Sequence, residues 1–149
     1  MKRDHVLPTP EDTHALGRDL AGVLRPGDLV VLVGPLGAGK TALTQGIGVG
    51  LGVREPVTSP TFVIARVHQG GRVPLVHVDA YRLGGVADVD DLDLDASTDE
   101  SVTVVEWGQG LVERLADEHL EIHLDRRDDD VRTALLVPHG PGWERRLAR

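Results

Sequence analysis

The chain has no cysteine and no asparagine among its 149 residues, and its only lysines are Lys2 and Lys40. Without cysteine there is no disulfide framework, no thiolate zinc site and no cysteine nucleophile. Guanine-specific switch proteins typically carry an Asn-Lys-x-Asp string, so the missing asparagine disfavours a GTP-binding regulator. Aromatic residues make up only 3% of the chain, which is too few for a platform that stacks nucleic-acid bases.

Positive charge is also scarce, because 16 basic residues face 24 acidic ones and the net charge at pH 7 is −8. This balance excludes tight, sequence-independent binding to DNA or anionic lipid. The longest clean apolar run, Leu29–Val33, is far too short to span a membrane. The polar residues 1–10 lack the apolar stretch of a signal peptide. We therefore expect a cytoplasmic protein with no membrane partner.

The apolar spacing predicts one α/β domain over residues 1–149. Helices are expected over 9–25, 41–51 and 109–115, with Thr9 as a cap of the first, although three glycines weaken the second. Strands are expected over 29–33, 61–68, 72–79, 101–106, 120–124 and 132–137, and Gly70-Gly71 predicts a hairpin. These elements indicate a three-layer sandwich whose mixed sheet is parallel at its centre and antiparallel at one edge.

The most informative string is Gly34-Pro35-Leu36-Gly37-Ala38-Gly39-Lys40-Thr41, a complete G-x-x-x-x-G-K-T. An apolar strand is predicted before it and a helix after it, which is the context that this phosphate-binding loop requires. The glycines let successive N–H groups point at phosphate oxygens beside the positive end of the helix. Lys40 would neutralise the β- and γ-phosphates, and the Thr41 hydroxyl would bind Mg²⁺.

Acidic residues end two of the predicted strands, Asp79 after one apolar run and Glu106 after another. Ligands of open α/β sheets bind at the carboxyl ends of strands, so either acid is a candidate for holding Mg²⁺, directly or through water. Residues 58–62, Thr-Ser-Pro-Thr-Phe, are a candidate switch whose hydroxyls bond the metal or the γ-phosphate. His77 shares the sheet face of Asp79, and we interpret it as a packed or hydrogen-bonded residue.

Two further patterns are poor candidates for metal sites. Residues 88–100 hold seven acidic side chains, but Ala96 and Val102 occupy positions where a calcium loop needs Gly and Glu. We interpret this segment as a solvated acidic face or a surface that docks a partner. His119 and His123 alternate with Leu120, Ile122 and Leu124, which predicts an exposed face of a strand rather than a zinc site.

Four motifs read in order resemble those of the TsaE (formerly YjeE) family, bacterial P-loop ATPases of tRNA threonylcarbamoyladenosine biosynthesis. They are the phosphate loop, Ser59-Pro60-Thr61-Phe62, His77-Val78-Asp79-Ala80-Tyr81-Arg82-Leu83 and Glu106-Trp107, and the resemblance spans roughly residues 9–137. The loop departs from the usual pattern at Pro35, where the family has Asp. The segment after the Tyr-Arg-Leu motif is rich in Asp, where the family has Glu.

The resemblance implies a single P-loop ATPase domain with ATP and Mg²⁺ as cofactors. It implies ATP contacts from Gly34, Leu36, Gly37, Ala38, Gly39, Lys40, Thr41 and Trp107, metal contacts from Thr41, Asp79 and Glu106, and catalytic roles for Lys40, Asp79 and Glu106. It further implies action with TsaD and TsaB proteins, and on tRNA only through them. A small P-loop kinase is the alternative. Residues 10–13 and the region near Arg132 are candidates for contact with adenine.

Overall fold

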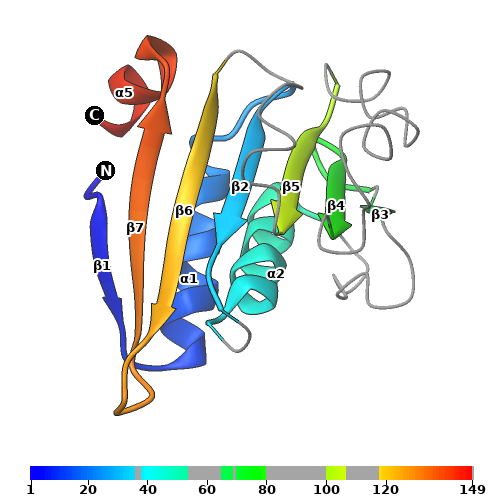
Figure 1. Cartoon of the computed structure of the whole chain (residues 1–149). Coiled ribbons are helices and arrows are strands. Elements are labelled where there is room, and N and C mark those ends of the chain that lie inside the picture. Colours follow the sequence, from blue (N-terminus) through cyan, green and yellow to red (C-terminus); the bar gives the residue numbers. More distant parts are fainter. Residues whose placement is uncertain (36–37, 54–64, 69, 80–99, 107–117, 149) are drawn as a thin grey trace.

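The computed structural model of the chain describes residues 1–35, 38–53, 65–68, 70–79, 100–106 and 118–148. Its strands form one seven-stranded sheet in the order β1-β7-β6-β2-β5-β4-β3 (Figure 1). The strands are β1 (Asp4–Leu7), β2 (Leu29–Val33), β3 (Ala65–His68), β4 (Leu75–Asp79), β5 (Val102–Glu106), β6 (His119–Arg126) and β7 (Arg132–His139). The helices are α1 (Pro10–Ala21), α2 (Lys40–Leu51) and α5 (Pro141–Leu147). None of the described helices has the length and apolar character needed to cross a membrane.

The sheet is mixed, as predicted. Strands β6, β2, β5 and β4 run parallel to one another and form its centre. The pair β3–β4 is antiparallel at one edge, and the pairs β6–β7 and β7–β1 are antiparallel at the other. Antiparallel strands therefore occupy both edges, where the sequence analysis expected one. The four residues of β1 show no apolar alternation that would have predicted them.

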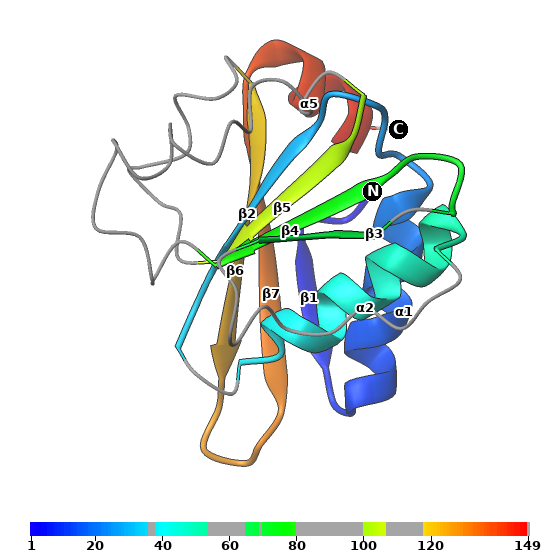
Figure 2. The same cartoon turned by 90° about the vertical axis from the view of Figure 1, so that its right-hand side faces the viewer.

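Helices α1 and α2 pack together against one face of the sheet (Figure 2). The core between them contains Leu16 and Leu20 from α1, Leu43 and Ile47 from α2, and alternate residues of the central strands. Full burial of each such side chain stabilises the fold by about 1.5–3 kcal/mol. The predicted helix over 109–115, which would belong to a further layer, lies outside the described residues.

A capping box starts α1 at the predicted residue. The Thr9 hydroxyl oxygen accepts a hydrogen bond from the N–H of Asp12, and the Asp12 carboxylate accepts one from the N–H of Thr9. The helix ends at Ala21 rather than near residue 25. Gly22, which follows directly, and Pro26, four residues later, both disfavour continuation of the helix.

Glycines allow the backbones of α1 and α2 to touch. A Cβ atom at Gly17 would lie 2.3 Å from the Leu43 carbonyl oxygen, and one at Gly46 would lie 2.1 Å from the His14 carbonyl oxygen. Gly46 and Gly50, two of the glycines that weaken α2 as an isolated helix, are thus required by its packing against α1. For this reason α2 continues to Leu51 despite its poor intrinsic propensity.

The short helix α5, which was not predicted, closes the core beyond β7. Trp143 is 1% exposed, and the Arg146 guanidinium lies 4.3 Å from the centre of its ring. Arg146 also donates two hydrogen bonds, of 2.6 and 3.0 Å, to the buried Asp28 carboxylate at the start of β2. This bidentate pair joins the end of the chain to the turn between α1 and β2.

Candidate functional site

The glycine-rich loop lies between β2 and α2, as predicted. It leaves β2 at Gly34, where a Cβ atom would lie 2.3 Å from the carbonyl oxygen of Leu124 on β6. It enters α2 at Gly39, whose φ of +101° is a left-handed value that other residues rarely adopt. Both glycines are therefore required by the local backbone. Leu36 and Gly37, predicted to bind nucleotide, lie outside the described residues.

The ammonium group of Lys40 lies inside this loop. Its Nζ donates hydrogen bonds to the carbonyl oxygens of Gly34, at 2.7 Å, and Pro35, at 3.0 Å. Lys40 is 6% exposed and is the first residue of α2, so its charge adds to the positive end of the helix dipole. Thr41 follows, half-buried, in the same first turn. Such a concentration of positive charge and backbone N–H groups suits an anion such as phosphate.

The two predicted carboxylates end neighbouring strands beside the loop. Asp79 ends β4 and pairs with Glu106 at the end of β5, and Glu106 pairs in turn with Leu32 on β2. Asp79, Glu106 and the start of the phosphate loop therefore lie together where the parallel strands β4, β5 and β2 end. Hydroxyl and carboxylate oxygens are hard ligands of the kind that Mg²⁺ takes, so the residue types at this edge fit that ion.

A buried histidine contacts one of these carboxylates. His77 Nε2 lies 3.0 Å from Glu106 Oε2, and the two residues are 0% and 6% exposed. The interpretation of His77 as a hydrogen-bonded residue is confirmed. The contact holds one oxygen of the Glu106 carboxylate against His77 at the end of β5, next to the strand from which the phosphate loop begins.

A cavity of about 420 Å³ opens beside the loop. It brings together both regions proposed to contact adenine, since Pro10 and Thr13 of α1 line it along with Arg132 of β7. Gly39 lines it from the loop, and Arg126 and Asp130 line it from the β6–β7 hairpin. Neither Arg126 nor Asp130 was predicted by residue, although the dense run of charges over 125–132 is a signal that could have identified both.

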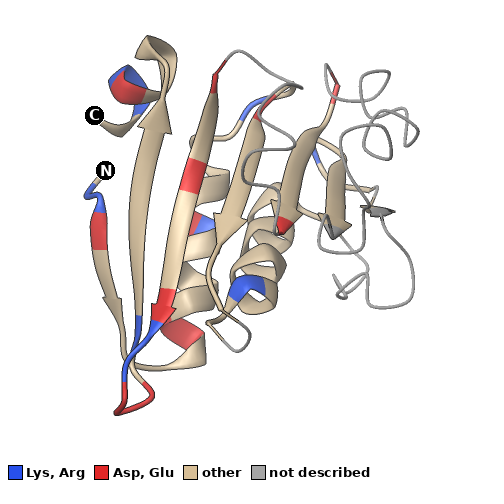
Figure 3. Cartoon of the chain, in the orientation of Figure 1, with Lys and Arg blue, Asp and Glu red and all other residues tan. Residues whose placement is uncertain are grey.

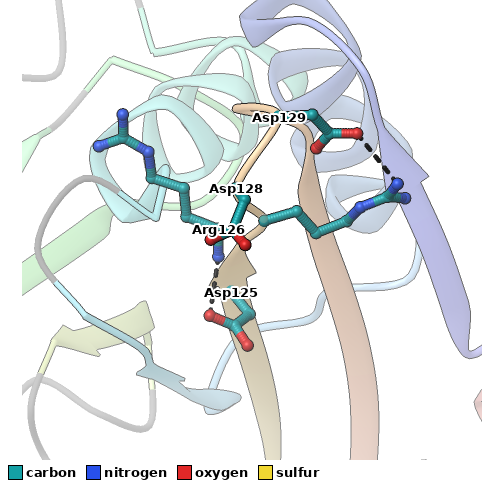
Figure 4. A pocket seen from close by; sticks show the side chains of 5 residues that line it. Asp125, Arg126, Asp128 and Asp129 are labelled. Atoms are coloured by element: carbon teal, nitrogen blue, oxygen red, sulfur yellow. Dashed lines mark hydrogen bonds and ion pairs between the residues drawn. The ribbon is translucent and has the colours of Figure 1, made fainter.

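Charges of both signs gather on the β6–β7 hairpin (Figure 3). Arg126 donates a hydrogen bond to the exposed Asp130 carboxylate, and this bond and the positive charge of Arg126 lower the pKa of Asp130 below its usual value. Arg127 and Asp129 form a second ion pair, of 3.0 Å, at the rim of a hollow of about 500 Å³ lined by residues 125–129 (Figure 4). Because the basic side chains here pair with acidic neighbours, the hollow is a weaker candidate for an anion site than the phosphate loop.

The remaining sequence predictions are either untested by the described residues or wrong. Trp107, the Thr-Ser-Pro-Thr-Phe segment over 58–62 and the acidic stretch up to residue 99 lie outside the described residues. The prediction that His119 lies on an exposed face is wrong, because the residue is 7% exposed and nearby Glu121 is 6% exposed. Apolar alternation correctly predicted that Leu120, Ile122 and Leu124 of β6 face the core. It does not indicate which residues cover the opposite face, where His119 and Glu121 lie.

Comparisons with known proteins agree on one family. Residues 7–134 match the model of the family described as threonylcarbamoyl adenosine biosynthesis protein TsaE. The chain is 58% identical over 135 residues to a Streptomyces coelicolor protein named tRNA threonylcarbamoyladenosine biosynthesis protein TsaE, covering 86% of this chain and 91% of that one. A Bacillus subtilis protein of the same name is 39% identical over 136 residues, 91% of this chain and 85% of that one. The crystal structure of Bacillus subtilis YdiB superposes with a TM-score of 0.81 at 32% identity, covering 97% of this chain and 90% of that one.

Proposed function

This chain belongs to the TsaE family, and from that membership we propose that it is a Mg²⁺-dependent ATPase serving the threonylcarbamoyladenosine modification of tRNA. The observation that carries the proposal is the burial of the Lys40 ammonium in a glycine-rich loop at the start of α2. Asp79 and Glu106 end the neighbouring strands at the same sheet edge. The cation of Lys40 and the two acids, Asp79 and Glu106, suit a nucleoside triphosphate with its metal ion.

Each residue of the loop has a distinct part in binding ATP. The backbone N–H groups of Gly34 and of residues 36–41 would donate to the phosphate oxygens beside the positive end of α2, whereas Pro35 has no N–H to offer. Lys40 offsets the charge of the β- and γ-phosphates, which grows on the oxygens as the terminal phosphate leaves. The base occupies the cavity of about 420 Å³ between α1 and the β6–β7 hairpin, and the family resemblance adds Trp107 as a candidate nucleotide contact.

The acids at the strand ends serve the metal and the attacking water. Thr41 and Glu106 would supply oxygens that hold Mg²⁺, with Asp79 as a further candidate ligand, and the bound ion would screen the phosphate charge. Glu106 is held by His77 in one orientation, and Asp79 takes part in metal binding or in activating the water. Hydrolysis by the isolated chain is slow and becomes productive in a complex with TsaD and TsaB proteins in the cytoplasm.

The test compares ATP hydrolysis by the parent chain and by three variants. Lys40→Ala should abolish ATP binding in a calorimetric titration, because it removes the charge that offsets the phosphates. Glu106→Gln should leave ATP bound and lower hydrolysis by about 10²-fold or more, the order expected when a positioning or activating group is lost. Glu144→Gln, an exposed change on α5, is the matched control and should change neither quantity. Unchanged ATP binding by Lys40→Ala would reassign the loop.

The partner is tested by co-elution with TsaD and TsaB proteins in size exclusion, with ATP, with ADP and without nucleotide. We expect tighter association with ATP, because a ligand shifts an equilibrium only through different affinities for its two states. Reversing the charges of Asp90, Asp91 and Asp93 to Lys should weaken this association and leave ATP binding by the isolated chain unchanged. Identical elution under all three conditions contradicts a coupled ATPase and restores the kinase alternative.

A further inference from the structure

A group of metal-ligating side chains lies on the sheet face opposite α1 and α2. His119 and Glu121 are two residues apart on β6, and both alternate with the core residues that face the helices. His139 on β7 is the residue that pairs directly with His119 across the two antiparallel strands. The ligand atoms of these three side chains all lie within 4.8 Å of one another.

Direct contacts hold the three side chains together. The imidazole rings of His119 and His139 stack, with their centres 4.3 Å apart and their planes 8° from parallel. The Nε2 atom of His139 is hydrogen-bonded to the Oε2 atom of Glu121. The Glu121 side chain is 8% exposed and that of His139 is 43% exposed. A largely buried carboxylate and two imidazoles therefore meet at a place that solvent reaches through His139.

This set of donors matches one class of ion. Two imidazole nitrogens and one carboxylate oxygen, with water in the fourth position, form a common zinc coordination sphere. Zinc–ligand distances of about 2.0–2.2 Å place tetrahedral ligand atoms roughly 3.3–3.6 Å apart. Binding therefore requires the three ligand atoms to move closer and one of the stacked rings to turn until both ring nitrogens point at the ion. Mg²⁺ prefers oxygen ligands in octahedral geometry, which separates this cluster chemically from the acids beside the phosphate loop. We propose that His119, Glu121 and His139 form a binding site for a zinc-class divalent ion.

The position of the cluster indicates a structural role. The phosphate loop follows Val33, whose partner on β6 is His123. His119 lies four residues before His123, about 13 Å away along the strand. An ion held by His119, Glu121 and His139 would cross-link β6 to β7 away from the nucleotide. Such an ion would bind whether or not the chain hydrolyses ATP.

The experiment titrates Zn²⁺ into the full chain, freed of any purification tag and dialysed against a chelator, in competition with a chromophoric zinc indicator. We expect one equivalent to bind per chain. His139→Ala and Glu121→Gln should each weaken Zn²⁺ binding by about 100-fold or more. Loss of a residue that only hydrogen-bonds to a metal ligand already costs about 10- to 100-fold in affinity, and loss of the ligand itself should cost at least as much. His14→Ala, which changes a histidine on α1, is the matched control and should leave the affinity unchanged.

Measurements of folding and thermal stability distinguish loss of the zinc site from loss of the fold in a variant. His139 is partly exposed, so its truncation should leave the chain folded, which far-ultraviolet circular dichroism in the presence of chelator verifies. Zn²⁺ should raise the Tm of the parent and of His14→Ala but not that of His139→Ala, because only a native-state ligand stabilises the fold. Failure of the parent to bind one equivalent, or equal binding by all folded variants, overturns the proposal. Neither result bears on ATP hydrolysis, which is measured separately.

Discussion

The contact between His77 and Glu106 gives the sharpest test of whether the strand ends hold the proposed Mg²⁺. His77→Leu removes the imidazole that lies 3.0 Å from Glu106 Oε2 and places an apolar side chain in a site that is 0% exposed. A hydrogen bond to a charged group contributes about 1.5–3 kcal/mol, and each 1.4 kcal/mol corresponds to a factor of about ten. If the contact serves to orient Glu106, ATP hydrolysis should fall roughly 10- to 100-fold.

The assay follows steady-state ATP hydrolysis at increasing Mg²⁺ concentration. The half-saturating concentration of Mg²⁺ should rise in His77→Leu, whereas calorimetric affinity for ATP without metal should stay at the parental value. His77→Gln retains a side-chain N–H and should recover part of the rate, and His14→Leu on α1 should behave as the parent. A folded His77→Leu chain with the parental rate and the parental Mg²⁺ dependence would refute the positioning role.

Three further changes test the site and its support. Thr41→Val deletes the hydroxyl and keeps the shape, so it should weaken binding of Mg²⁺–ATP far more than of metal-free ATP in calorimetry; equal losses contradict its role. Gly46→Ala should destabilise the chain by about 1–3 kcal/mol in urea unfolding, because its Cβ would lie 2.1 Å from the His14 carbonyl oxygen; a more stable variant means that helix propensity dominates. Arg146→Ala leaves buried Asp28 without its bidentate partner and should cost about 2–4 kcal/mol in the same assay, measured against Arg145→Ala; similar losses in both refute the pair.

Much of the candidate nucleotide site was predictable from sequence because it depends on local backbone chemistry. The strand over 29–33, the glycine-rich loop and the helix after it are specified by consecutive residues, and β2 has the predicted bounds. The parallel centre of the sheet followed from apolar strands separated by helices. Since the carboxyl ends of parallel strands meet at one edge, Asp79 and Glu106 were also expected there, and their register confirms that placement.

Only tertiary structure decided which distant residues share a surface. The cavity beside Gly39 needs Thr13 of α1 and Arg126 of the β6–β7 hairpin, and no local pattern relates these segments. The burial of His119, predicted to be exposed, likewise depends on what covers β6. Sequence alone determined the chemistry of the phosphate loop, because consecutive residues specify the conformation of its backbone. The fold decided the partners of that loop and the environment of each polar strand face, because both arise from contacts between segments far apart in the chain.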